Sequence, residues 1–131
     1  MKVRSSYTRL LVSDLEACFA FYRDVMEFNV TIDALQDGYA EFAVADMRLA
    51  LFRRQEMAEM IGNAHKPFAV ECQDRVVLTF TITDLDEAYQ QLRQKKIKFT
   101  TEPLNNPYYG LKTAYFRDPD GTLIGLFQTM L

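Results

Sequence analysis

The chain has 131 residues and a formal net charge of −3; 49% of its residues are hydrophobic and 25% are charged. This length and composition predict a globular protein whose core needs no disulfide bonds to hold it. The acidic balance argues against nucleic acid as a partner, because neutralising phosphates requires a basic face. No apolar run approaches the roughly twenty residues that a membrane span requires, so a membrane is not expected as a partner either.

The start of the chain and the cysteines favour a cytoplasmic protein. The first residues, MKVRSS, lack the apolar stretch of a signal peptide. Cys18 and Cys72 lie far apart without a CxxC spacing, which favours reduced thiols. By its spacing Cys18 falls on the buried face of a helix, where a thiol behaves as a small hydrophobe. Cys72 lies among acidic residues that disfavour a thiolate, so neither cysteine is expected to be a nucleophile.

The first half of the chain predicts a strand, a helix and three further strands. An apolar and β-branched run at residues 7–12 precedes Ser13, which we expect to cap a helix, with Glu16 completing a capping box. Apolar side chains then recur every three or four residues, as on one face of a helix. The three following strands are expected at residues 29–34, 39–44 and 48–52.

The second half repeats this order about seventy positions later. Residues 76–82 form its first predicted strand, Thr83 is the expected N-cap, and Asp86 stands three residues further on. Its later strands are expected at residues 98–100, 113–117 and 123–127. The chain is therefore predicted to form β-α-β-β-β twice. This gives one domain, 1–131, of two modules at about 1–53 and 75–131, joined by a segment 54–74 with a short helix at 55–61.

Several motifs resemble the glyoxalase, bleomycin-resistance and extradiol-dioxygenase proteins, also called the vicinal oxygen chelate superfamily. These motifs are LLVSDL at 10–15, FYRDVMEF at 21–28, YGLK at 109–112 and FRDPDG at 116–121. The resemblance implies an α+β fold in which two βαβββ modules form a cupped mixed sheet, with helices outside and a ligand on the concave side. It implies less about activity, because the superfamily includes isomerases, dioxygenases, thiol transferases and drug-binding proteins.

The resemblance also implies where a metal would be bound. Metal enzymes of this superfamily use His, Gln or Glu in the first and last strands of the modules. The corresponding positions here are Tyr7, Ala50, Val77 and Gly125, none of which is a usual ligand of a divalent metal ion. The sole histidine, His65, falls between the modules and is expected to be structural or solvated. We therefore expect no metal and no other cofactor.

Side-chain alternation along the strands predicts which residues would face the concave side. Ala50 and Gly125 would leave room there, and surrounding aromatic rings would suit a planar or amphipathic ligand. The predicted ligand-binding residues are Tyr7, Arg9, Arg48, Ala50, Phe52, Tyr109, Tyr115, Gly125 and Phe127.

Several of these residues could instead have a purely structural role. The rings of Phe52 and Phe127 could belong to the core, and Arg9 and Arg48 could be solvated strand charges. In a loop rich in Pro, Asn and Gly, the pair Tyr108 and Tyr109 is either a lid over the ligand or packing for the loop itself. The carboxylates of Asp118 and Asp120 are expected to form a turn with their own backbone rather than a catalytic pair.

The leading hypothesis is a metal-independent small-molecule binding protein that resembles bleomycin-resistance proteins and forms a homodimer. It would hold an amphipathic or aromatic ligand. The alternative is an enzyme of the same superfamily, lyase-, isomerase- or dioxygenase-like, with Tyr7 and Glu41 as the first candidates for acid and base chemistry. A third hypothesis is a regulatory or structural role without ligand. Because the chain also lacks a GxSxG motif, a P-loop and a Rossmann fingerprint, binding is preferred over catalysis.

Overall fold

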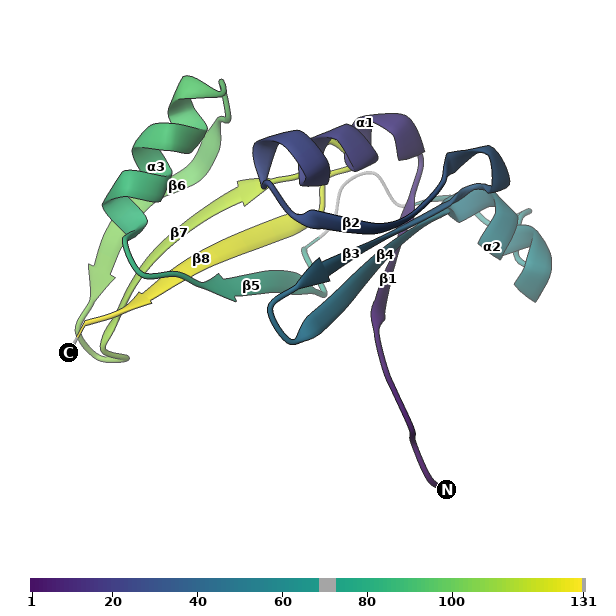
Figure 1. Ribbon diagram of the computed structural model, residues 1–131, viewed down its shortest axis with the longest axis horizontal. Coiled ribbons are helices and arrows are strands. Elements are labelled where there is room, and N and C mark those ends of the chain that lie inside the picture. The colour runs from purple at the N-terminus through teal and green to yellow at the C-terminus, as the bar shows by residue number, and fades with distance from the viewer. Residues whose placement is uncertain (69–72, 131) are drawn as a thin grey trace. The chain divides into compact units, whose positions relative to one another are not determined.

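A computed structural model describes residues 1–68 and 73–130, which places Cys72 outside the described residues. The chain divides into two compact units, Met1–Val70 and Glu71–Leu131. We call them the N-terminal unit and the C-terminal unit. Each contains one four-stranded sheet and its own helices (Figure 1). That the two units form a single domain stays a prediction.

The N-terminal unit has the predicted order of strands and helices. Its sheet runs β1-β4-β3-β2, with β1 parallel to β4 and the other neighbours antiparallel. A π-helical turn, η1, continues α1, and a short 3₁₀ turn, η2, precedes β3. The elements are β1 Thr8–Val12, α1 Leu15–Ala20, η1 Phe21–Val25, β2 Asn29–Ala34, η2 Leu35–Asp37, β3 Tyr39–Val44, β4 Met47–Arg53 and α2 Arg54–Ile61.

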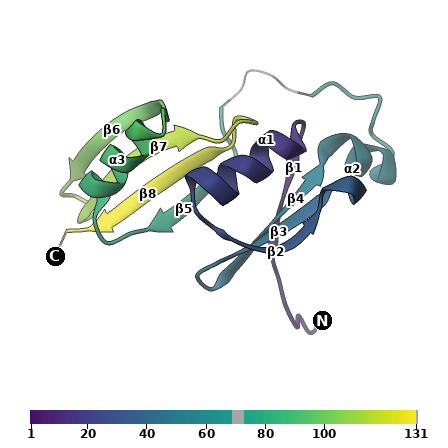
Figure 2. The ribbon, with the colours of Figure 1, turned by 45° about the horizontal axis from the view of Figure 1, so that its top comes forward.

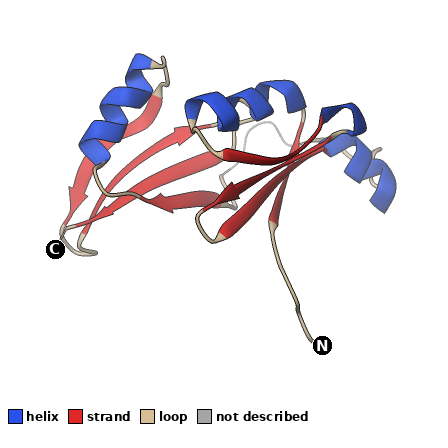
Figure 3. Ribbon diagram, in the orientation of Figure 1, coloured by secondary structure: helices blue, strands red, loops and turns tan. Residues whose placement is uncertain are grey.

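The C-terminal unit repeats this topology with a sheet of order β5-β8-β7-β6, in which β5 is parallel to β8. Helix α3 packs against β6, β7 and β8 (Figure 2). The two mixed sheets with their helices (Figure 3) confirm the predicted α+β fold. The elements are β5 Val77–Thr81, α3 Leu85–Gln94, β6 Phe99–Asn106, β7 Leu111–Arg117 and β8 Leu123–Thr129.

Strand β6 is longer than the predicted strand at 98–100, because it continues through Pro103, which was expected in a loop. A proline is tolerated there because β6 is the edge strand of its sheet, and its pairing with β7 shifts register on either side of Thr101. The remaining connection is a short turn that holds Tyr108 and Tyr109.

The predicted helix caps are each displaced by one residue. Asp14, not Ser13, caps α1, and its Oδ1 accepts a hydrogen bond from the Ala17 backbone N–H at 3.0 Å. Asp84, not Thr83, caps α3 in the same way, through the backbone N–H of Glu87 at 3.0 Å. A carboxylate at the N-cap also interacts favourably with the positive end of the helix dipole, which explains this choice over the neighbouring hydroxyl.

The core of each unit lies between its sheet and its helix. In the N-terminal unit Leu49 and Leu51 of β4 are fully buried, and the Phe42 ring lies 5.6 Å from Phe19 of α1 and 6.0 Å from Tyr22 of η1. Cys18 is buried on the same helix, as predicted. In the C-terminal unit the buried side chains on the sheet include Leu78, Ala114, Phe116, Ile124 and Leu126.

The described part of the chain has no helix that is long and apolar enough to cross a membrane.

Candidate functional site

The candidate site lies on the face of the N-terminal sheet that points away from the core. Because side chains alternate along a strand, Arg48, Ala50 and Phe52 project opposite to the buried Leu49 and Leu51. The strand register places Arg9 and Glu41 on either side of Ala50, and Leu11 and Tyr39 on either side of Phe52. We call this surface, with Tyr7 at its end, the open face.

Arg9 is held among three aromatic rings on the open face. Its Cζ lies 5.6 Å from the centroid of the Tyr7 ring, 5.4 Å from that of Tyr39 and 5.2 Å from that of Phe52. Its Nη2 also donates a hydrogen bond to the Tyr7 hydroxyl at 2.9 Å. A guanidinium within about 6 Å of an aromatic centroid is attracted by the ring quadrupole. The sequence predicted the two arginines and two of the rings, and the structure brings them together.

Arg48 and Tyr39 complete this cluster. The Cζ of Arg48 lies 5.5 Å from the centroid of the Tyr7 ring, so that two guanidiniums lie beside this exposed ring. Tyr39 was not predicted as a site residue. Its signal was its place in an alternating strand, two residues before Glu41, and the short connection from residue 44 to 48 indicated that its strand pairs with the next one.

Glu41 is a buried carboxylate on the same face, with 7% of its surface exposed. Its Oε1 accepts a hydrogen bond from the Tyr39 hydroxyl at 3.1 Å, and its Oε2 accepts one from the Thr31 hydroxyl at 3.3 Å. Burial and the hydrogen bond to Glu41 raise the pKa of Tyr39 above its ordinary value. The phenol is therefore a neutral donor near pH 7.

The room expected at Ala50 and Gly125 is filled. Ala50 has no exposed surface, because the long side chains of Arg9 and Glu41 flank it. At Gly125 an added Cβ would lie 2.9 Å from Cε1 of Tyr115 and 3.0 Å from Cε1 of Phe127. These two rings pack edge to face, with centroids 6.1 Å apart. The prediction of an open void at Gly125 is therefore wrong.

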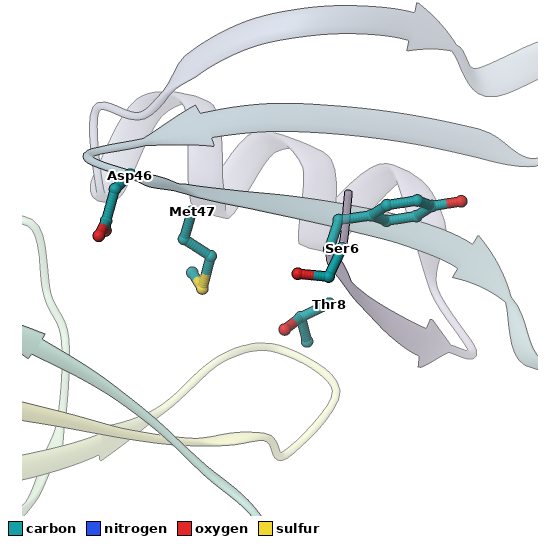
Figure 4. Close-up of a pocket in the computed structure, with 5 residues that line it drawn as sticks. Ser6, Thr8, Asp46 and Met47 are labelled. Atoms are coloured by element: carbon teal, nitrogen blue, oxygen red, sulfur yellow. The ribbon is translucent and has the colours of Figure 1, made fainter. Parts of the chain in front are cut away.

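A hollow that the sequence did not reveal lies at the end of the open face. It has a volume of about 370 Å³ and is lined by Ser6, Tyr7, Thr8, Asp46 and Met47. In Figure 4 the side chains of Asp46 and Met47 border one side of this space, and those of Ser6 and Thr8 border the other. Its volume lies within the range of small-molecule sites. The hollow joins segments forty residues apart, so that no local motif could have indicated it.

Tyr109, the remaining predicted site residue, lies on an exposed turn. Tyr108 and Tyr109 are 87% and 68% exposed, and their rings contact one another edge to face with centroids 4.9 Å apart. His65 was expected to be either structural or solvated, and in the structure it is exposed to solvent. Asp118 is a turn former, as predicted, because its Oδ1 accepts the backbone N–H groups of Asp120 and Thr122, both at 2.9 Å.

The described residues hold no cluster of the side chains that usually bind metal ions. Within 1–68 and 73–130, no three side chains among His, Cys, Asp and Glu lie close enough together to hold a metal ion. The metal-binding positions of each unit hold Tyr7 and Ala50, and Val77 and Gly125. Metal independence stays a prediction, since it concerns what the protein binds in solution.

Comparison with known proteins places the chain in a family. Residues 4–126 match the model of the glyoxalase, bleomycin resistance protein and dioxygenase superfamily. A Bacillus subtilis (strain 168) protein described as uncharacterized protein YraH is 30% identical over 122 residues, which are 93% of this chain and 95% of that protein.

Two solved structures have a similar fold. A glyoxalase, bleomycin resistance protein or dioxygenase from Nocardioides is 27% identical, with a TM-score of 0.74 over 99% of this chain and 87% of that one. A lactoylglutathione lyase from Agrobacterium tumefaciens is 21% identical, with a TM-score of 0.70 over 98% of this chain and 96% of that one, a likeness that shows the fold alone. With the family model matching nearly the whole length, the chain belongs to the glyoxalase, bleomycin resistance protein and dioxygenase superfamily.

Proposed function

We propose that this chain is a metal-independent binding protein that holds an amphipathic or aromatic small molecule on the open face of its N-terminal unit. The observation that carries the proposal is the cluster of Tyr7, Arg9, Tyr39, Arg48 and Phe52, which adjoins the hollow through Tyr7. Ring faces supply stacking area for a planar ligand, and the guanidiniums supply orientation. The chelating residues that a metal enzyme of this superfamily would need are absent from the corresponding sequence positions.

Tyr7 gives the most direct test, because its side chain belongs to both the cluster and the hollow. Native mass spectrometry of the purified protein should show a co-purified small molecule, and Tyr7→Ala should lose it. Tyr7 is 45% exposed, so its removal should leave the fold intact. Phe68→Ala is a matched control: Phe68 is a 51% exposed ring in the same unit, with the Arg54 guanidinium 4.3 Å from its centroid.

A bound molecule should also stabilise the protein. Ligand at a hundred times its dissociation constant raises the free energy of unfolding by about 2.7 kcal/mol, which a thermal shift resolves. If the Tyr7→Ala protein keeps both the co-purified molecule and the thermal shift, the ligand does not bind on the open face.

The enzyme alternative rests on Glu41. It is a buried carboxylate whose two oxygens are oriented by Tyr39 and Thr31, an arrangement that a general base could use in a lyase- or isomerase-like reaction. A Glu41→Gln variant separates the two functions. A binder should consume nothing in either form, whereas an enzyme should turn over substrate in the parent and lose its rate, but not its binding, in Glu41→Gln.

We also propose a cytoplasmic homodimer without a nucleic-acid or membrane partner. Support comes from exposed apolar side chains that a second copy could cover, such as Met60 at 70% and Ile61 at 65% exposure on α2. Sedimentation at tens of micromolar chain concentration tests this proposal, and a monomer there would contradict it.

A further inference from the structure

We infer that the small molecule bound on the open face carries an oxyanion, a carboxylate or a phosphate, and that Arg9 and Arg48 bind it beside Tyr7. This inference rests on the proposed function and adds the chemical class of the ligand.

Both guanidiniums lie beside the same ring. The Cζ atoms of Arg9 and Arg48 lie 5.6 Å and 5.5 Å from the centroid of the same Tyr7 ring. Their residues belong to neighbouring parallel strands and project from the same face. Both residues are exposed. Two like charges beside one exposed ring favour a bound anion that neutralises both.

Neither Arg9 nor Arg48 forms an ion pair with an acidic side chain among the described residues. Three other arginines do: Arg23 lies 2.7 Å from Asp24, Arg53 3.5 Å from Glu16 and Arg117 2.8 Å from Asp74. The chain has 18 acidic residues against 15 basic ones, so acidic partners are plentiful elsewhere.

The one acidic residue of strands β1, β3 and β4 is already engaged. Glu41 is buried and accepts hydrogen bonds from Tyr39 and Thr31. Asp46 borders the hollow, and its negative charge disfavours an anion inside the hollow itself. The oxyanion therefore belongs at the arginines, with the uncharged part of the ligand towards the hollow.

The donors fit this role. A guanidinium has five N–H donors in a planar fork that matches the oxygens of a carboxylate or a phosphate. Arg9 uses one of them on the Tyr7 hydroxyl, while its three rings hold the group in place. Arg48 contacts the Tyr7 ring and, among the residues described, makes no hydrogen bond to protein. Donors of both guanidiniums are left for a ligand.

The experiment compares probes that share one ring and differ in charge. Isothermal titration calorimetry is run with naphthoate, naphthyl phosphate, the neutral naphthamide and the cationic naphthylmethylammonium. We expect the two anions to bind about tenfold or more tightly than the amide, and the cation to bind most weakly. Raising the salt concentration should weaken the anions only, because exposed charges are screened. Between the two anions, the tighter one identifies the carboxylate or the phosphate as the better mimic.

Arg48→Gln should weaken the binding of the two anions about tenfold without changing the affinity for the amide. Arg48→Lys should restore part of that loss, because it keeps the charge but not the fork. Arg93→Gln is the matched control. Arg93 is an exposed arginine of α3 whose Cζ lies 5.4 Å from the Tyr89 ring, and it has no ion pair within the described ranges. This control should bind all four probes as the parent does.

Equal affinity for naphthoate and naphthamide, unchanged in Arg48→Gln, would overturn this inference and leave the proposed function standing. If none of the four probes binds the parent protein, the inference and the proposed function both fail. Because the Arg48 side chain is exposed, loss of the fold is not expected in Arg48→Gln, and circular dichroism checks it.

Discussion

The two units carry a small residue at matching places in their sheets, Ala50 in β4 and Gly125 in β8, yet the surfaces around these residues differ in chemistry. Ala50 lies between Arg9 and Glu41, whereas Gly125 lies between Thr79 and Tyr115. In the N-terminal unit, charged side chains therefore surround the methyl group of Ala50. In the C-terminal unit, the Tyr115 ring covers the backbone of Gly125.

The difference lies in the cross-strand neighbours and in one atom. Ala50 has a Cβ and a long charged side chain on either side of it. Without a Cβ at Gly125, the Tyr115 ring lies directly against the strand, an arrangement in which a cross-strand aromatic covers a glycine in a sheet. A repeated backbone order thus does not repeat the chemistry of the face. Among the described residues, Arg9 and Arg48 of the N-terminal unit form no ion pair, whereas Arg117 of the C-terminal unit does.

The largest expected effect comes from refilling Gly125. A Gly125→Leu change should destabilise the protein by about 1–3 kcal/mol, because the new side chain must displace the rings of Tyr115 and Phe127. The midpoint of urea unfolding should fall while the slope stays constant. This expectation reverses the one drawn from the sequence, which foresaw open room at Gly125.

The control for Gly125→Leu removes the ring it would meet. In a Tyr115→Ala background the same leucine should be much less destabilising, because the space is vacant, and the double-mutant cycle should show strong coupling. A leucine that is tolerated equally in both backgrounds would contradict the described packing of Tyr115 over Gly125.

The same contrast explains what could be predicted from the sequence. Strand alternation and the repeated helix starts are local patterns, so the strands and the burial of Leu49, Leu51, Ile124 and Leu126 followed from them. Whether a face is open depends on side chains from neighbouring strands. The short connections between β3 and β4 and between β7 and β8 indicate which strands pair, but not that the Tyr115 ring lies over Gly125. Arg9 comes from the distant strand β1, and the hollow joins Ser6 to Asp46 across two strand ends.

The second prediction concerns the charged face. Tyr39→Phe should lower the free energy of unfolding by about 1.5 kcal/mol, the low end for a hydrogen bond to a charged group, because Tyr39 is only half-buried. Since the folded state raises the pKa of Tyr39, its contribution is complete below the ordinary tyrosine pKa of about 10 and is lost as pH rises through the raised value. Alkaline unfolding compared between parent and Tyr39→Phe measures this loss. Identical alkaline profiles would contradict it.

The third prediction concerns what the two units share. Asp14→Ala and Asp84→Ala each remove an N-cap and should each destabilise the protein by about 1 kcal/mol. Thr83→Ala is the control. Thr83 lies one residue before the cap, so its replacement should have little effect on stability. If Thr83→Ala destabilises the protein as much as Asp84→Ala does, the Thr83 hydroxyl is the N-cap after all.

The smallest effect is expected at the arginine of the C-terminal unit that, unlike Arg9 and Arg48, has an acidic partner. Arg117 forms a bidentate ion pair with Asp74, with both distances at 2.8 Å, and its hydrogen bonds lower the pKa of Asp74. Asp74→Asn should cause only a slight loss, because both side chains are largely exposed and water and salt screen the pair. Since the folded-state pKa is lowered, the stabilisation is present above the ordinary aspartate pKa and disappears as pH falls through the lowered value. Acid unfolding of parent and Asp74→Asn should therefore converge at low pH.

The control is Arg48→Gln, which removes an arginine without an acidic partner and should leave the acid unfolding profile unchanged. If it changes that profile, a carboxylate pairs with Arg48 in solution and the contrast between the two units fails.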